Sequence, residues 1–172
     1  TVVLLRFGSA QVDYALLQDS SLLIRTPDGV RELKDTRQDV LNVAYYAEQF
    51  SHLAAGETFA SPGYNDSLDR MVDNERRVRN AGGFYTFTGL RGAAQHAVVG
   101  SIPLTSDTEF VLASDGAARY WTTFGQPMST VFDATLTSVY ELVRKNEQGD
   151  TTGRAFPRVG AQDDFSLVRV RA

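Results

Sequence analysis

The chain contains no cysteine and only two histidines, His52 and His96, among its 172 residues. Without cysteine it has no disulfide scaffold, no thiolate zinc site and no cysteine nucleophile. Two histidines are too few for a histidine-rich metal centre. Any metal must therefore be held mainly by carboxylates, which favour hard ions such as Mg²⁺ or Mn²⁺.

Long apolar runs, repeats and an excess of positive charge are also missing. No stretch approaches the roughly 20 apolar residues of a membrane span, so we expect no membrane partner. Lys plus Arg number 17 against 21 Asp plus Glu, a formal net charge of -4 that argues against a nucleic-acid partner. No signal peptide precedes the first residue, so the expected compartment is the cytoplasm.

The chain lacks two common catalytic motifs. It has no glycine-rich phosphate loop of the Walker or Rossmann type, and no serine stands in a Gly-x-Ser-x-Gly elbow. Its length suits one globular domain, so we expect residues 1–172 to fold together. The chain begins at Thr1 within a predicted strand, which suggests that a segment was removed or that this is a piece of something larger.

Alternating apolar residues and turn chemistry predict an antiparallel meander near the start, with Pro27-Asp28-Gly29 as a tight turn. The predicted strands are 2–7, 12–17, 21–26, 30–33, 84–87, 109–114 and 165–170. Helical spacing predicts helices over 38–55, from 65 or 66 to about 79, and over 130–147 after a Ser129 cap, with one or two turns at 93–99. In the first helix the predicted core stripe is Val40, Val43, Ala44, Ala47, Phe50, Ser51 and Ala54. The fold class is therefore α+β, with a sheet covered by helices.

Carboxylates stand at the tips of three predicted strands. Asp115-Gly116 follows the strand 109–114, Asp163-Asp164 precedes the last strand, and Asp19 lies between the second and third. A helix cap or a solvated turn explains each of them taken alone. Adjacent carboxylates repel, however, so one of a pair commonly faces a cation. If the three tips converge, they suit a hard divalent ion, which takes oxygen ligands from separate elements.

Four segments, in chain order, resemble the metal-dependent protein phosphatases of type 2C. Residues 18–21 (Gln-Asp-Ser-Ser) resemble that family's Gly-Asp-Ser-Arg hairpin, and residues 75–83 resemble its Arg-Ile-x-x-Ala-Gly-Gly element. Residues 110–116 (Phe-Val-Leu-Ala-Ser-Asp-Gly) resemble its Leu-Ala-Ser-Asp-Gly strand. Residues 163–170 resemble its terminal Asp-Asn-x-Ser/Thr strand, and the loop 154–158 before it is similar to compact bacterial members.

This resemblance implies an αββα sandwich of antiparallel sheets flanked by helices, with two or more Mn or Mg ions between the sheets. Asp115 and Asp163 match metal ligands of the family, and Asp19 matches a carboxylate associated with a further, weaker metal. Gly116 and Asp164 would support them, with Asp164 in the place of the family's Asn. The implied activity is hydrolysis of a phosphorylated protein substrate by a metal-activated water.

The chain departs from the family pattern in several places. The phosphate-gripping arginine, the Glu-Asp pair and the Asp-Gly-His-Gly motif of the family's N-terminal half have no counterpart here. Gln18 replaces a glycine and Ser21 an arginine. The resemblance thus covers the C-terminal half of such a phosphatase. We expect a missing N-terminal segment or a partner chain to supply the other ligands and to cover exposed sheet edges and apolar faces.

Two alternatives stay open. In an Ntn-type hydrolase, which also has an αββα sandwich, Thr1 would be the nucleophile and its α-amino group the base. Against this, no lysine falls on the expected third strand, since Lys34 follows it. The other alternative is a catalytically inactive phosphatase-like domain that binds phosphoproteins or regulates a partner.

Overall fold

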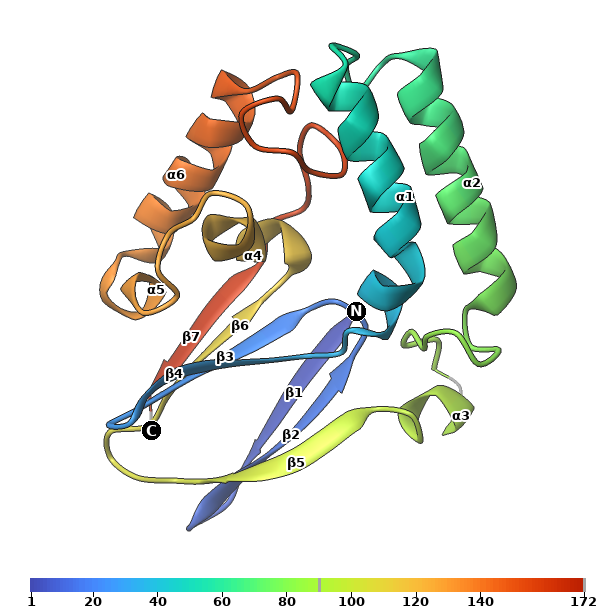
Figure 1. Cartoon of the computed structure of the whole chain (residues 1–172). Helices are drawn as coiled ribbons and strands as arrows, with labels where there is room; N and C mark the ends of the chain where they lie inside the picture. The colour runs from blue at the N-terminus through green and yellow to red at the C-terminus, as the bar shows by residue number, and fades with distance from the viewer. Residues whose placement is uncertain (90, 172) are drawn as a thin grey trace.

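Seven strands form two antiparallel sheets in the computed structural model, which describes residues 1–89 and 91–171 (Figure 1). The first sheet has the order β1-β2-β5, made of β1 (Val2–Phe7), β2 (Gln11–Leu17) and β5 (Val98–Pro103). The second has the order β4-β3-β6-β7, made of β4 (Gly29–Lys34), β3 (Ser21–Thr26), β6 (Glu109–Ala113) and β7 (Leu167–Arg171). The predicted α+β class and antiparallel pairing are confirmed.

Apolar side chains from both sheets pack into one cluster. Val12 and Leu16 come from β2, while Leu22, Ile24 and Phe110 come from the second sheet, and all five are fully buried. They alternate along their strands because successive strand residues point to opposite faces. The turn after Leu17 carries the chain from the first sheet to the second, so Asp19 lies where the two sheets meet.

The other face of the second sheet is covered by three helices: α4 (Asp115–Thr122), α5 (Thr130–Asp133) and α6 (Leu136–Gly149). The single helix predicted over 130–147 is wrong, since α5 and α6 are separate. Ala134 is extended between them, and the Thr135 hydroxyl accepts a hydrogen bond from the Ser138 N–H and caps α6. The first N–H groups of a helix have no acceptor within the helix, and the Thr135 hydroxyl supplies one for Ser138. A separate helix, α6, therefore begins after Thr135.

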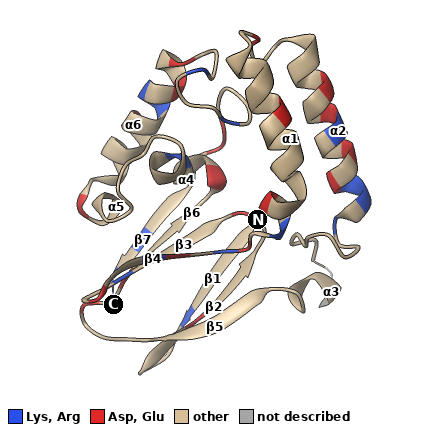
Figure 2. Cartoon of the chain, viewed as in Figure 1, with Lys and Arg blue, Asp and Glu red and all other residues tan. Residues whose placement is uncertain are grey.

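Helices α1 (Arg37–Ala54) and α2 (Pro62–Val78) form an antiparallel pair beside this layer (Figure 1). The start predicted for α2 at 65 or 66 is wrong. The helix begins at Pro62. The N–H groups of a first helical turn have no acceptor within the helix, so proline, which lacks an N–H, loses no hydrogen bond at this position. Figure 2 shows that α2 carries both acidic and basic residues. Among them Arg70, Asp73, Arg76 and Arg77 are exposed, as expected for a charged helix.

Most of the apolar stripe predicted as the buried face of α1 is instead exposed, and only Phe50 of that stripe is half-buried. The buried side of α1 carries Asn42, Gln49 and Leu53. Val40 and Val43 have 71% and 64% of their surface accessible, whereas Asn42 is fully buried. Asn42 donates to the Glu75 carboxylate, as does Gln38. A buried carboxylate needs donors, and only the polar side of α1 supplies them.

Residues 79–103 differ most from the prediction. The strand expected at 84–87 is a single bridge between Arg79 and Phe84. In place of helical turns at 93–99 there is a short helix, α3 (Arg91–Ala94), and then the strand β5. Pairing with β2 decides this, since β5 lies along β2 over its whole length.

Candidate metal centre

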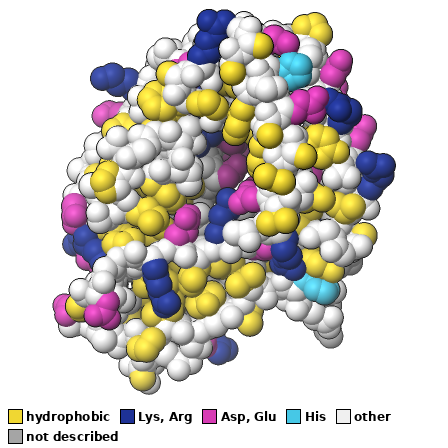
Figure 3. All heavy atoms as spheres, viewed as in Figure 1, with side chains coloured by type: hydrophobic (Ala, Val, Ile, Leu, Met, Phe, Trp, Pro, Cys, Tyr) yellow, Lys and Arg dark blue, Asp and Glu magenta, His cyan; other side chains and the backbone are white. Residues whose placement is uncertain are grey.

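A cleft of about 330 Å³ lies between α1–α2, α4 and the turn that links the two sheets. Its walls carry five carboxylates and two cationic side chains: Asp19, Asp39, Glu75, Asp115 and Asp163, with Lys34 and Arg119. Figure 3 shows acidic and basic side chains together in the hollow beside α1. The three carboxylates singled out from the sequence, Asp19, Asp115 and Asp163, thus share one cleft.

Asp115 stands where β6 ends and α4 begins. Ser114, and not Asp115, is the helix cap, because its hydroxyl accepts a hydrogen bond from the Ala117 N–H. The same hydroxyl accepts from the Ser166 N–H, and the Ser114 N–H donates to the Ser166 carbonyl at 2.9 Å. These bonds extend the pairing of β6 with β7 and bring the segment 163–164 against the start of α4.

Gly116 makes that approach possible. A Cβ at this position would lie 2.0 Å from the Asp164 carbonyl oxygen and 3.0 Å from the Asp163 Cβ. Only a residue without a side chain leaves room for the neighbouring backbone. The predicted supporting role of Gly116 therefore has a specific form: it lets Asp163 lie close to Asp115.

Asp163 is held by donors on both of its carboxylate oxygens. Its Oδ1 accepts from the Asp164 N–H at 2.8 Å, and its Oδ2 accepts from Arg119 Nη2 at 3.1 Å. Burial raises the pKa of Asp163, and the charge of Asp115 and a side-chain hydrogen bond with it raise that pKa further, against the opposing charge of Arg119. The two carboxylates are therefore close enough to repel when both are ionised.

Asp19 faces the same cleft from the turn between β2 and β3. Burial raises the pKa of its carboxyl, and the charge of Lys34 opposes that shift only in part. Among the described residues, its Oδ1 is buried without a hydrogen-bond partner. A buried carboxylate oxygen without a donor is unfavourable unless a cation or water meets it.

These features fit a hard divalent ion. The cleft offers carboxylate oxygens from three separate segments, the kind of ligand set that Mg²⁺ and Mn²⁺ prefer. Asp115 and Asp163 are the residues that would hold one such ion, and Asp19 is the residue that would contact a further one. Across residues 1–89 and 91–171, however, no three Asp, Glu, His or Cys side chains lie close enough together to form a complete set of metal ligands.

The sequence reasoning missed Arg119 and Glu147. Both are buried, and Arg119 Nη1 contacts Glu147 Oε1 at 2.6 Å. A signal was present, because Glu147 follows Val139 and Val143 at intervals of four residues on the core face of α6. A charged side chain on the buried face of a helix is unfavourable unless an opposite charge pairs with it, so Glu147 predicts a buried cationic partner.

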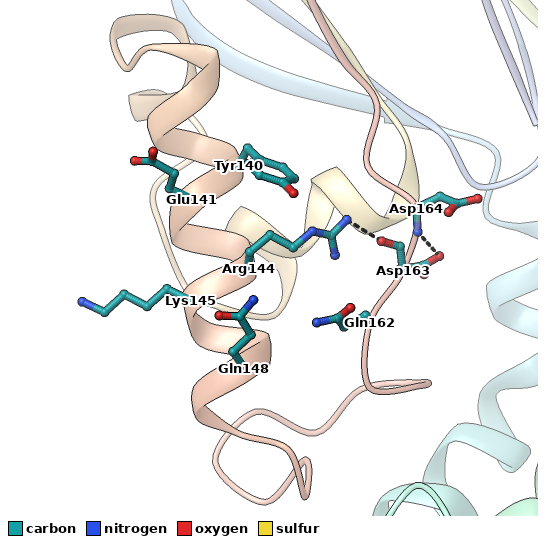
Figure 4. A pocket seen from close by; sticks show the side chains of 8 residues that line it. All are labelled: Tyr140, Glu141, Arg144, Lys145, Gln148, Gln162, Asp163 and Asp164. Carbon is teal, nitrogen blue, oxygen red and sulfur yellow. Dashed lines mark hydrogen bonds between the residues drawn. The ribbon is translucent and has the colours of Figure 1, made fainter.

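Asp164 does not line the cleft. With Asp163 and Gln162 it borders a neighbouring groove, whose opposite wall is the side of α6 that carries Tyr140, Arg144 and Gln148 (Figure 4). Its backbone carbonyl accepts a hydrogen bond from the Ser114 hydroxyl at 3.2 Å. Asp164 therefore acts on the centre through its backbone rather than its carboxylate.

Thr1 lies next to the cleft, in a separate hollow bordered by Ser20, Ser114 and Val168. Its hydroxyl is hydrogen-bonded to the Ser20 hydroxyl. Lys34 pairs in register with Ser21, but its ammonium group binds Asp39 at 2.7 Å.

No family model and no curated protein matches this chain. Within the described ranges, no helix is long and apolar enough to cross a membrane. The functional assignment therefore rests on the cleft and on the sequence motifs that line it.

Proposed function

We propose that this chain carries part of the active centre of a metal-dependent phosphatase of type 2C that acts on phosphoserine or phosphothreonine in proteins. Asp115 and Asp163 would bind one divalent ion, Mn²⁺ or Mg²⁺, and Asp19 would help to bind a further one. When bound, such ions lower the pKa of a coordinated water and offset negative charge on the phosphoryl oxygens. Arg119 and the Asp164 N–H hold the Asp163 carboxylate in place.

The juxtaposition of Asp115 and Asp163 carries this proposal. They come from segments 48 residues apart in the sequence, and the Ser114–Ser166 bonds and the bare Gly116 backbone bring them together. Two half-buried carboxylates that repel each other weaken a fold unless something binds them. A divalent cation removes that repulsion, and hydrolysis of a phosphate ester is a reaction that such a centre serves.

We also propose that this chain belongs to an αββα sandwich. The remaining ligands of the metal ions would come from a segment or partner chain outside these residues. The outer face of the β1-β2-β5 sheet supports this. Leu4, Ala15 and Val99 are neighbours across its three strands, and Leu4 and Val99 have 60% and 68% of their surface accessible. Another protein segment covering this face would bury these apolar side chains.

The test is Mn²⁺-dependent hydrolysis of a phosphoprotein, and of p-nitrophenyl phosphate, by the complete protein. Asp115→Asn and Asp163→Asn should each lower turnover by at least about 10²-fold, because each removes a charged metal ligand. Asp69→Asn, which removes an exposed carboxylate on α2, is the matched control and should leave turnover unchanged. Full turnover in both cleft variants, or full turnover in the presence of a chelator, would exclude the assignment.

A further inference from the structure

Glu147 is a carboxylate with 1% of its surface accessible, and two arginines share it. Arg119 of α4 contacts Oε1 at 2.6 Å, and Arg144 of α6 contacts Oε2 at 2.5 Å. Each carboxylate oxygen thus has its own guanidinium. Charge-assisted bonds of this kind fix both arginine head groups in direction.

Both arginines also reach Asp163. Arg119 Nη2 donates to the Asp163 carboxylate at 3.1 Å. Arg144 Nη2 donates to the Asp163 carbonyl at 2.7 Å, as Figure 4 shows. One arginine therefore orients the side chain and the other anchors the backbone of the same residue. The Glu147 carboxylate is paired with these two arginines and makes no hydrogen bond to Asp163.

We infer that Glu147 is a positioning residue for the candidate metal centre, acting on Asp163 through Arg119 and Arg144. This inference rests on the proposed function, because it concerns the affinity of the same centre for a divalent ion. Arg119 and Arg144 are direct partners of the proposed ligand Asp163, and altering such partners typically changes metal affinity by 10- to 100-fold. Glu147 lies one step further away and acts by fixing both arginines.

Packing alone does not account for Glu147. Its neighbours on the same face of α6, Val139 and Val143, are fully buried and apolar, and an apolar residue would continue that stripe. A buried ion pair is often no more stabilising than well-packed apolar side chains. The charge at position 147 is explained by the two arginines that it orients, because both of them donate to Asp163. Arg119 also donates to the Val159 carbonyl at 2.6 Å, in the same segment of chain.

The buried pair Arg158–Asp150 gives the contrast. Arg158 Nη1 contacts Asp150 Oδ2 at 2.9 Å, and the two side chains are 2% and 8% accessible. Apart from the Asp150 carboxylate, Arg158 donates only to backbone carbonyls, those of Glu147, Asp150, Phe156 and Ala161. This pair therefore builds the loop before β7, and it meets Glu147 through the backbone and not through the carboxylate. It is as buried as the Glu147 pairs, and it does not contact Asp163.

The experiment measures Mn²⁺ binding by titration calorimetry on the folded, complete protein, with Glu147→Gln as the test and Arg158→Gln as the matched control. The amide in Glu147→Gln can accept from only one arginine and leaves an extra positive charge behind Asp163. We expect Mn²⁺ affinity to fall about tenfold or more. Arg158→Gln should lower the urea midpoint of unfolding and change Mn²⁺ affinity by less than about twofold.

Unchanged Mn²⁺ affinity in Glu147→Gln, or an equal loss in Arg158→Gln, overturns the inference. If the unaltered protein binds no Mn²⁺, the proposed function fails first, so the two failures are distinguishable. Arg119→Lys answers the same question where Glu147→Gln does not fold. It keeps the charge but loses the planar fork that reaches Glu147 and Asp163 together, so Mn²⁺ affinity should again fall about tenfold.

Discussion

Replacing Gly116 by alanine tests whether the close approach of two segments builds the centre. The new Cβ would lie 2.0 Å from the Asp164 carbonyl oxygen. Non-bonded heavy atoms prefer separations of about 3.5–4.0 Å, so the backbone around residues 163–164 must retreat by about 1.5 Å. That carbonyl belongs to the backbone and cannot rotate away as a flexible side chain would.

The expected loss of stability follows from two opposing effects. Overpacking against a rigid neighbour costs about 3 kcal/mol at the upper end of its usual range. Alanine in place of glycine near the start of α4 regains at most about 1 kcal/mol of helix propensity. The free energy of unfolding of Gly116→Ala should therefore fall by about 2 kcal/mol, which for a domain of this size lowers the melting temperature by about 4–8 °C.

Urea unfolding followed by circular dichroism measures the stability effect, and Mn²⁺-dependent hydrolysis measures the functional one. A shift of more than 1 Å at a reactive centre commonly lowers the rate by about 10²-fold. Gly149→Ala is the control, because a Cβ there meets no atom within 4 Å and the position ends α6. If Gly116→Ala unfolds at the same urea concentration as Gly149→Ala, the close approach is not a constraint and the reasoning is refuted.

Two further predictions concern the backbone and the pH dependence of stability. Gln18 has a φ of 69°, in the left-handed region, so Gln18→Gly should raise the free energy of unfolding by about 0.5–1 kcal/mol. Asn80→Gly, at a φ of 57°, should gain less, because asparagine tolerates this region, and an equal gain in urea unfolding would contradict the strain argument. Burial raises the pKa of Asp150, but hydrogen bonds from the Phe156 N–H and from Arg158 outweigh it and leave the pKa below its ordinary value of 3.8. A lowered pKa contributes stability that is present above about pH 4 and lost as the pH falls through the folded value. The stability difference between the unaltered protein and Asp150→Asn should therefore be larger at pH 7 than at pH 2, and a difference independent of pH would show that ionised Asp150 adds nothing.

Local sequence chemistry was enough to predict the first four strands and the strand that leads to Asp115. Alternating apolar residues specify which side of a strand is buried, and Pro27-Asp28-Gly29 specifies the turn between β3 and β4. Asp19, Asp115 and Asp163 were identifiable for the same reason, because each is a carboxylate beside a predicted strand.

Features that depend on distant partners were not predictable from the sequence. The strand β5 exists because it pairs with β2, about 85 residues earlier in the chain. Val40 is exposed because Glu75 on α2 requires donors from the opposite side of α1. In both cases a contact between distant segments outweighs the local pattern.

For the candidate site, too, some features follow from the sequence and others depend on contacts between distant segments. Residue types and strand ends alone predict that this chain presents carboxylates suited to a hard cation. Only the tertiary structure decides that Asp163 meets Asp115 over the bare backbone of Gly116, and that Glu147 directs two arginines to Asp163. The physical reason is that burial and partner choice belong to the packed molecule, and a side chain's charge and reach acquire a role only when its neighbours are in place.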